Sequence, residues 1–325
     1  MNNNDFIPPY PFKNKHISTV VPSLFRKIKD VSYERVRIDT PDNDFLDVDF
    51  SINGSRSIHV IIHGLEGNSQ KAYVKGLVRI TGKAGIDAAA INLRGCSDED
   101  NKNFYSYHSG KTEDVDTVIN YITKNYNYEE IFLSGFSLGG NIVLKYAGEK
   151  GKDINPAIKT ATGISVPCDL KSVAYNFTKR SNFLYQYRFI SSLRKKALKK
   201  SERFPEYRHL EKPIKSCRSF LDFDNLITAP SNGFKDAEEY WTKSSCKPYI
   251  ELIRIPALLI NAQNDPFLTD ECYPHKEAEK NPYFKLTIPK YGGHAGFVNS
   301  YKLNGELWHE NFVIKFILRN SKIYS

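Results

Sequence analysis

Polar and apolar residues alternate in two short runs near the start of the chain, at residues 33–40 and 45–52. Between them lies the turn-forming sequence Pro41-Asp42-Asn43-Asp44. Alternation with a period of two is typical of a strand that buries one face. The two runs therefore predict an antiparallel pair of strands at the flank of a sheet.

From residue 57 onward the pattern changes to continuous apolar runs that alternate with helical periodicity. Buried strands are predicted at residues 58–62, 86–92, 131–133, 159–166, 256–261 and 284–288, and helices near 70–84, 112–124, 141–147, 271–280 and 305–320. Strands without polar alternation are buried on both faces, and strand–helix repeats favour parallel pairing. This part of the chain predicts an α/β fold, a mainly parallel sheet of about eight strands with helices on both faces.

Two segments fall outside this rhythm. Residues 1–30 carry prolines at positions 8, 9 and 11 and show little periodicity, which predicts an extended strap packed on the body rather than a helix. Residues 168–250 are rich in Lys and Arg, helical in stretches and free of buried strands. The expected organisation is a strap over 1–30, an α/β core over 31–167 and 251–325, and a helical cap over 168–250.

Composition narrows the class of protein. The 325 residues suffice for one large α/β domain with an insertion, or for two modest domains. The net charge of +9 suits nucleic acid, an anionic membrane or an acidic substrate, yet no nucleic-acid-binding motif accompanies it. We therefore expect no nucleic-acid partner. The sequence does not indicate whether the protein is a monomer or an oligomer.

The cysteines and the termini bear on the compartment. The five cysteines are unclustered, which argues against a disulfide framework and against a metal site. The first residues lack the basic and apolar regions of a signal peptide, and no apolar run approaches the ~20 residues that span a bilayer. We expect a cytoplasmic protein without a bound metal or other cofactor.

The chemistry of the chain centres on Gly135-Phe136-Ser137-Leu138-Gly139. A β-rich run precedes this G-x-S-x-G motif and a helical pattern follows it, which is the context of a nucleophile elbow. The flanking glycines allow a tight strand-to-helix turn that exposes the Ser137 hydroxyl. The alternative is an ordinary glycine-rich turn.

A serine nucleophile needs a base, and the base needs a group that orients it. Asp265 and His294 each follow a predicted strand, in the chain order that this kind of elbow requires. We therefore predict Ser137, Asp265 and His294 as the catalytic residues. We expect Asp270 to cap a helix, and His275 and His309 to lie at the surface.

An oxyanion needs hydrogen-bond donors. We assign this role to the backbone N–H groups of Leu138 and of Leu65, which lies in His63-Gly64-Leu65-Glu66-Gly67 after a predicted strand. His63 is interpreted as a structural hydrogen-bonding residue rather than a second base. His108 has two readings, a contact to substrate and a buried loop anchor, of which we favour the anchor.

Six motifs occur together in this order: the His63 loop, Asn92-Leu93-Arg94-Gly95-Cys96-Ser97, Tyr107-His108-Ser109-Gly110, the Ser137 elbow, Asp265-Pro266-Phe267 and Gly292-Gly293-His294-Ala295-Gly296-Phe297. The set resembles the YheT-type branch of the α/β-hydrolases, which is similar to the eukaryotic ABHD1/2/3-type lipid hydrolases. The resemblance extends from about residue 8 to 315.

The resemblance implies a cofactor-free carboxylesterase or lipase-like serine hydrolase that cleaves acyl esters through an acyl-enzyme. It assigns the catalytic roles to Ser137, Asp265 and His294 and implies a small-molecule or lipid acyl ester as substrate. Thioester hydrolysis or acyl transfer on the same residues is the alternative. A non-catalytic lipid-binding member of the fold is a further one.

The predicted cap contains an amphipathic stretch at residues 187–200. Phe189, Ile190, Leu193, Ala197 and Leu198 fall near one helical face, and Lys and Arg crowd the other. One interpretation is contact with an anionic membrane surface. The interpretation we favour is a cap helix whose basic face is solvated.

Overall fold

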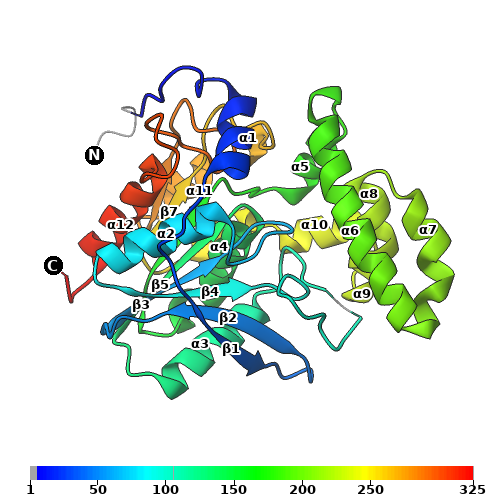
Figure 1. Ribbon diagram of the computed structural model, residues 1–325, viewed down its shortest axis with the longest axis horizontal. Coiled ribbons are helices and arrows are strands. Elements are labelled where there is room, and N and C mark those ends of the chain that lie inside the picture. The colour runs from blue at the N-terminus through cyan, green and yellow to red at the C-terminus, as the bar shows by residue number, and fades with distance from the viewer. Residues whose placement is uncertain (1–5, 105, 325) are drawn as a thin grey trace.

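The computed structural model describes residues 6–104 and 106–324 and contains one eight-stranded sheet (Figure 1). The strand order is β1-β2-β4-β3-β5-β6-β7-β8. The strands are β1 (Glu34–Asp39), β2 (Phe45–Ser51), β3 (Ser57–Ile62), β4 (Asp87–Asn92), β5 (Glu130–Phe136), β6 (Ile158–Ile164), β7 (Ala257–Ile260) and β8 (Phe284–Thr287). The predicted mainly parallel sheet is confirmed.

The pairing follows the polarity of each strand. β1 and β2 pair antiparallel, as their alternation predicts, and β2 pairs antiparallel with β4. Strands β4, β3, β5, β6, β7 and β8 pair parallel. Strands β3, β4 and β5 are buried along their whole length. Because parallel strands end at the same edge, the loops after β3, β5, β7 and β8 gather on one side of the sheet.

Helices cover both faces of the sheet (Figure 1). The helices α2 (Ala72–Lys83) and α12 (Trp308–Asn320) share one apolar core with the sheet. The helices α3 (Glu113–Asn125) and α4 (Leu138–Lys150) share the core on the opposite face. The helix α11 (His275–Lys280) precedes β8.

Between β6 and β7 the chain forms helices and no strand among its described residues. They are α5 (Leu170–Phe177), α6 (Phe183–Arg203), α7 (Glu211–Ser216), α8 (Phe220–Phe223), α9 (Ala229–Ser231) and α10 (Ala237–Ser244), with a π-helical turn at Asp224–Thr228. In Figure 1 these helices stand to one side of the sheet, and small apolar clusters of their own hold them together. We call this segment the cap.

The N-terminal segment differs from the predicted strap. The helix α1 occupies Lys15–Phe25, so the expectation of an extended chain over the whole of 1–30 is wrong there; residues 1–5 lie outside the described residues. The Asn14 side chain accepts hydrogen bonds from the first helical N–H groups, and the prolines at 8, 9 and 11 all precede Asn14. Pro22 lies within the helix, a position in which proline is disfavoured because it cannot donate a backbone hydrogen bond.

Of the two histidines expected at the surface, His275 is exposed, whereas the expectation for His309 is wrong. His309 has no exposed surface and packs against the rings of Phe136 and Phe297. The buried ion pair between Arg26 of the N-terminal segment and Glu310, at 2.6 Å, covers this end of α12. α12 therefore buries polar residues in addition to its apolar face.

The cysteines are all free and buried. Within residues 6–104 and 106–324, no group of three or more His, Cys, Asp or Glu side chains is arranged to hold a metal ion. Across the same residues, no helix combines the length and the apolar character that crossing a membrane requires.

Candidate active site

Ser137 lies at the junction of β5 and α4, where the chain passes from strand to helix. Its φ of +52° falls in the left-handed region that serine rarely adopts. The Ser137 N–H donates to the Ile164 carbonyl of β6 at 2.8 Å, and its carbonyl accepts from the Asn141 N–H at 3.0 Å. Strained backbone of this kind persists only where its surroundings impose it, and it is frequent at functional sites.

The two glycines of the elbow are required by close backbone approach. A Cβ on Gly135 would lie 2.2 Å from the Gly139 carbonyl oxygen. A Cβ on Gly139 would lie 2.4 Å from the His63 carbonyl oxygen. Contacts this short are excluded, so only glycine allows the strand, the helix and the loop after β3 to meet beside Ser137.

Asp265 and His294 are brought together at the ends of β7 and β8. The Nδ1–H of His294 donates to Oδ2 of Asp265 at 2.8 Å, while Oδ1 accepts from the Phe267 N–H at 2.9 Å. The Asp265 side chain is fully buried, whereas the His294 side chain is 14% exposed. Because Nδ1 carries the shared proton, Nε2 of the neutral ring is left as an acceptor.

The loop that carries His294 is fastened by α1. The Thr19 hydroxyl accepts from the His294 N–H at 2.9 Å, and the Ser18 hydroxyl donates to the Gly292 carbonyl at 2.8 Å. Sequence reasoning missed this role, because it assigned α1 to an extended strap. The signal that could have found it is the apolar spacing of Ile17, Val21 and Leu24 behind Asn14.

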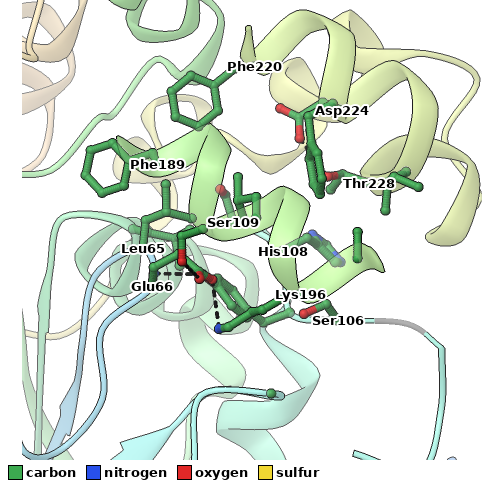
Figure 2. A pocket seen from close by; sticks show the side chains of 18 of the residues that line it. Leu65, Glu66, Ser106, His108, Ser109, Phe189, Lys196, Phe220, Asp224 and Thr228 are labelled. Atoms are coloured by element: carbon green, nitrogen blue, oxygen red, sulfur yellow. Dashed lines mark hydrogen bonds and ion pairs between the residues drawn. The ribbon is translucent and has the colours of Figure 1, made fainter. Parts of the chain in front are cut away.

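Ser137 and His294 both line one cavity of about 460 Å³ between the sheet edge and the cap. Its wall is largely apolar, formed by Val173, Phe177, Phe189, Phe220, Phe267 and Leu268, among others. In Figure 2, Phe189 and Phe220 lie on one side of the view, and Asp224, Thr228 and His108 lie on the other. The cavity therefore offers an apolar region and a more polar region to whatever it binds.

Leu65 and Leu138 also line this cavity. Leu138 is the first residue of α4, whose first-turn N–H groups have no partner within the helix. Behind Leu65, His63 donates from Nδ1 to the Gly64 carbonyl at 2.7 Å and accepts at Nε2 from the Leu93 N–H at 3.1 Å. Complete burial lowers the pKa of His63 to about 4. A neutral ring with both nitrogens engaged acts as a structural support of this loop.

Glu66, the next residue of the loop, links the loop to the cap. Its carboxylate accepts hydrogen bonds from the Tyr107 hydroxyl at 2.9 Å and from Ser192 of α6. It also accepts from Lys196 of α6 at 2.9 Å (Figure 2). Glu66 also has a φ of +56°. Sequence reasoning missed this contact, because its partners lie 126 and 130 residues further along the chain.

The family model described as the alpha/beta hydrolase fold matches residues 60–300 of this chain. The chain belongs to the α/β-hydrolase family. Within that family it is 32% identical to the putative esterase YheT of Escherichia coli over 313 residues, which cover 94% of this chain and 91% of that protein. The predicted YheT-like resemblance is confirmed.

More distant relatives share much of the chain. The monoacylglycerol lipase of Saccharomyces cerevisiae is 31% identical over 86% of this chain, which corresponds to 62% of the lipase. The human phospholipase ABHD3 is 26% identical over 82% of this chain and 67% of its own length. Among solved structures, a Pyrococcus furiosus esterase superposes with a TM-score of 0.61 at 18% identity, covering 90% of this chain and 91% of its own, which supports the fold.

In this α/β-hydrolase, His108 makes contacts within the protein and also lines the cavity, so its contact with substrate stays a prediction. It lines the cavity, and its Nδ1 accepts from the Gly110 N–H at 3.1 Å. Its ring also packs edge-on against Phe234 and Tyr240. Burial lowers the pKa of His108 to about 3, so the ring is neutral at pH 7. It anchors its loop and forms part of the cavity lining.

The amphipathic stretch of the cap lies within α6 and turns its apolar face inward. Ile190 and Ala197 are buried in the cap, and Phe189 lines the cavity. The basic face is only partly solvated, because Lys196 binds Glu66 and Lys200 donates to the Phe104 carbonyl at 3.0 Å. Part of this face of α6 is therefore occupied by the protein itself.

Proposed function

We propose that this α/β-hydrolase is a carboxylic ester hydrolase that uses Ser137, His294 and Asp265 and forms an acyl-enzyme. The observation that carries the proposal is the 2.8 Å hydrogen bond between Asp265 and His294 beside a cavity that Ser137 also lines. In this scheme His294 Nε2 takes the proton of the Ser137 hydroxyl as its oxygen attacks the ester carbonyl. Asp265 holds the ring in the required tautomer and stabilises its charged form.

The remaining steps use groups already at the cavity. The backbone N–H groups of Leu65 and Leu138 hold the oxyanion of the tetrahedral intermediate, and loss of such donors typically costs about 10²–10³ in rate. His294 then protonates the leaving alcohol, and a water molecule activated by the same ring releases the acid. Each proton removed from a nucleophile is thus returned to a leaving group.

The apolar wall supports an acyl chain as the part of the substrate bound under the cap. Phe177, Phe189 and Phe267 line the cavity together with His294, and the ring centroids of Phe267 and His294 lie 4.3 Å apart. The relatives named as an esterase, a monoacylglycerol lipase and a phospholipase support acyl esters, including lipid esters. The five free thiols support a reducing compartment, and we place the protein in the cytoplasm.

The test compares Ser137→Ala and Asp265→Asn with wild type on p-nitrophenyl esters of increasing acyl length and on monoacylglycerol. We expect kcat/KM to fall about 10⁴-fold or more in both variants. Ser137→Ala should also lose labelling by a fluorophosphonate. The matched control is Ser300→Ala, which removes an exposed hydroxyl 163 residues after Ser137 in the sequence and should retain both activities. Undiminished turnover by Ser137→Ala would exclude the proposed nucleophile.

A further inference from the structure

The N-terminal end of α6 carries a second apolar surface that faces outward. Phe183 is 59% exposed, Leu184 is 77% exposed and Tyr187 is 63% exposed. The rings of Phe183 and Tyr187 stack with their centroids 6.4 Å apart. We call these three residues the tip patch.

The tip patch is not explained by packing within the chain. Single exposed apolar residues are ordinary, whereas larger contiguous apolar patches, especially with a polar rim, mark surfaces that bind another molecule. Phe183 and Leu184 precede Tyr187 by four and three residues, so both neighbour Tyr187 on the surface of the helix. The inward face of the same helix is already satisfied, since Ile190 is 2% exposed. Exposing these three side chains to water is therefore unfavourable, and they contribute nothing to the packing of the core.

Cations flank the tip patch in sequence, and the same stretch of sequence carries no acid. Lys179, Arg180 and Arg188 are exposed, and no ion pair or side-chain hydrogen bond engages them among the described residues. Residues 170–201 contain nine Lys or Arg and no Asp or Glu. An apolar surface with a positively charged margin complements an anionic lipid surface, into which apolar side chains insert while the cations meet phosphate groups.

The tip patch is also continuous with the wall of the cavity. Tyr185, between the patch residues, packs its ring 4.8 Å from the ring of Phe267, which in turn lies against His294. One turn further along α6, Phe189 lines the cavity itself. The same helix thus carries the tip patch and Phe189, which Figure 2 shows at the apolar wall that we assign to the acyl chain.

We propose that the tip patch docks this protein on the surface of an anionic lipid bilayer, with Phe183, Leu184 and Tyr187 inserted and Lys179, Arg180 and Arg188 on the phosphate groups. The purpose of this docking rests on the proposed function, because a protein docked there would have lipid acyl esters beside its cavity. The docking itself requires no catalysis. The interaction is reversible and weakens as salt screens the cations.

The experiment measures sedimentation of the full chain with phosphatidylcholine vesicles that contain or lack phosphatidylglycerol. Wild type should bind the phosphatidylglycerol vesicles, and the partition coefficient should fall about tenfold or more for Leu184→Ser/Tyr187→Ser. Arg180→Gln/Arg188→Gln should also bind less and should lose most of the salt dependence. The matched control, Leu24→Ser/Phe25→Ser, removes an apolar pair of α1 that is 54% and 63% exposed and lies outside the tip patch, and it should bind as wild type does.

Three results would overturn the proposal. The first is failure of the wild type to sediment with phosphatidylglycerol vesicles, and the second is unchanged binding by Leu184→Ser/Tyr187→Ser. The third is a wild-type dimer in analytical ultracentrifugation that this variant dissociates, which would show that a second copy of the chain covers the patch. Ser137→Ala separates the two proposals, since it should lose hydrolysis and keep vesicle binding. Hydrolysis of p-nitrophenyl acetate by Leu184→Ser/Tyr187→Ser should stay within twofold of wild type.

Discussion

At the elbow below the cavity, backbone approaches backbone, whereas under the cap, side chains meet side chains. Gly135 and Gly139 have no room for a single added carbon, and Ser137 is held at a positive φ between β5 and α4. The cap is instead joined to the core through side-chain contacts, such as those of Lys196 with Glu66 and of Tyr240 with Ser109.

This difference separates two tasks within one site. Backbone packing cannot adjust to a substitution, so it holds reacting groups in one arrangement. Side-chain contacts can change one at a time while the helices that carry them keep their fold. We call the elbow and the strand ends around it the floor of the cavity, and the cap its roof. The floor is therefore suited to keeping one reaction, and the roof is suited to changing the substrate.

The largest effect should come from adding a methyl group to the floor. Gly139→Ala places a Cβ 2.4 Å from the His63 carbonyl oxygen and 2.5 Å from that of Ile62, both of which are backbone atoms. We expect the free energy of unfolding, measured in urea, to fall by about 3 kcal/mol or more, with loss of fluorophosphonate labelling. Gly82→Ala in α2 is the control, because its Cβ would meet only the Asn53 amide at 3.6 Å. Equal stability of the two variants would remove the basis of the comparison.

An intermediate effect on stability should come from lowering the pH, because histidines buried beneath the floor stay neutral in the folded chain. His59 in β3 bonds to Thr81 and Ser134, and burial lowers its pKa from 6.5 to about 3. The unfolded chain takes up a proton below pH 6.5 that the folded chain refuses, so stability falls as the pH drops from 6.5 toward 3. This single residue should account for roughly 2 kcal/mol of the loss between pH 7 and pH 5.

The measurement is urea unfolding at both pH values for wild type and His59→Gln. The variant should lose roughly 2 kcal/mol less than wild type over this interval. His275→Gln, whose ring is exposed on α11, should reproduce the wild-type pH dependence. An identical pH dependence for all three proteins would contradict the assignment of His59 as a neutral buried group.

The smallest effect should come from one contact between roof and floor. The Tyr240 hydroxyl accepts from the Ser109 N–H and donates to the Ser109 hydroxyl, both at 2.9 Å. Tyr240→Phe leaves that buried N–H without its partner, and the free energy of unfolding should fall by about 1 kcal/mol. The rate of Ser137 labelling by a small fluorophosphonate should remain within twofold. Tyr283→Phe, at a partly exposed ring, is the control; a large drop in labelling for Tyr240→Phe alone would mean that the roof positions the nucleophile.

The sequence predicts the floor better than the roof, because the floor depends on local patterns. Apolar strands followed by Ser137, Asp265 and His294 could be recognised without knowing what lies across the cavity. The contacts of Glu66 could not, since both of its partners on α6 are remote in sequence. His309 was misassigned for a related reason, because the rings that bury it come from β5 and from the loop after β8.

The hydrogen bond between Thr19 and His294 joins positions 275 residues apart. During synthesis the elbow at Ser137 can fold long before the loop of His294 has left the ribosome. Until that loop docks on α1, a nascent chain has the proposed nucleophile but does not yet hold the proposed base in place. The contact therefore makes the chemistry one of the last properties that the growing chain acquires, after the helices of the cap already exist to enclose it.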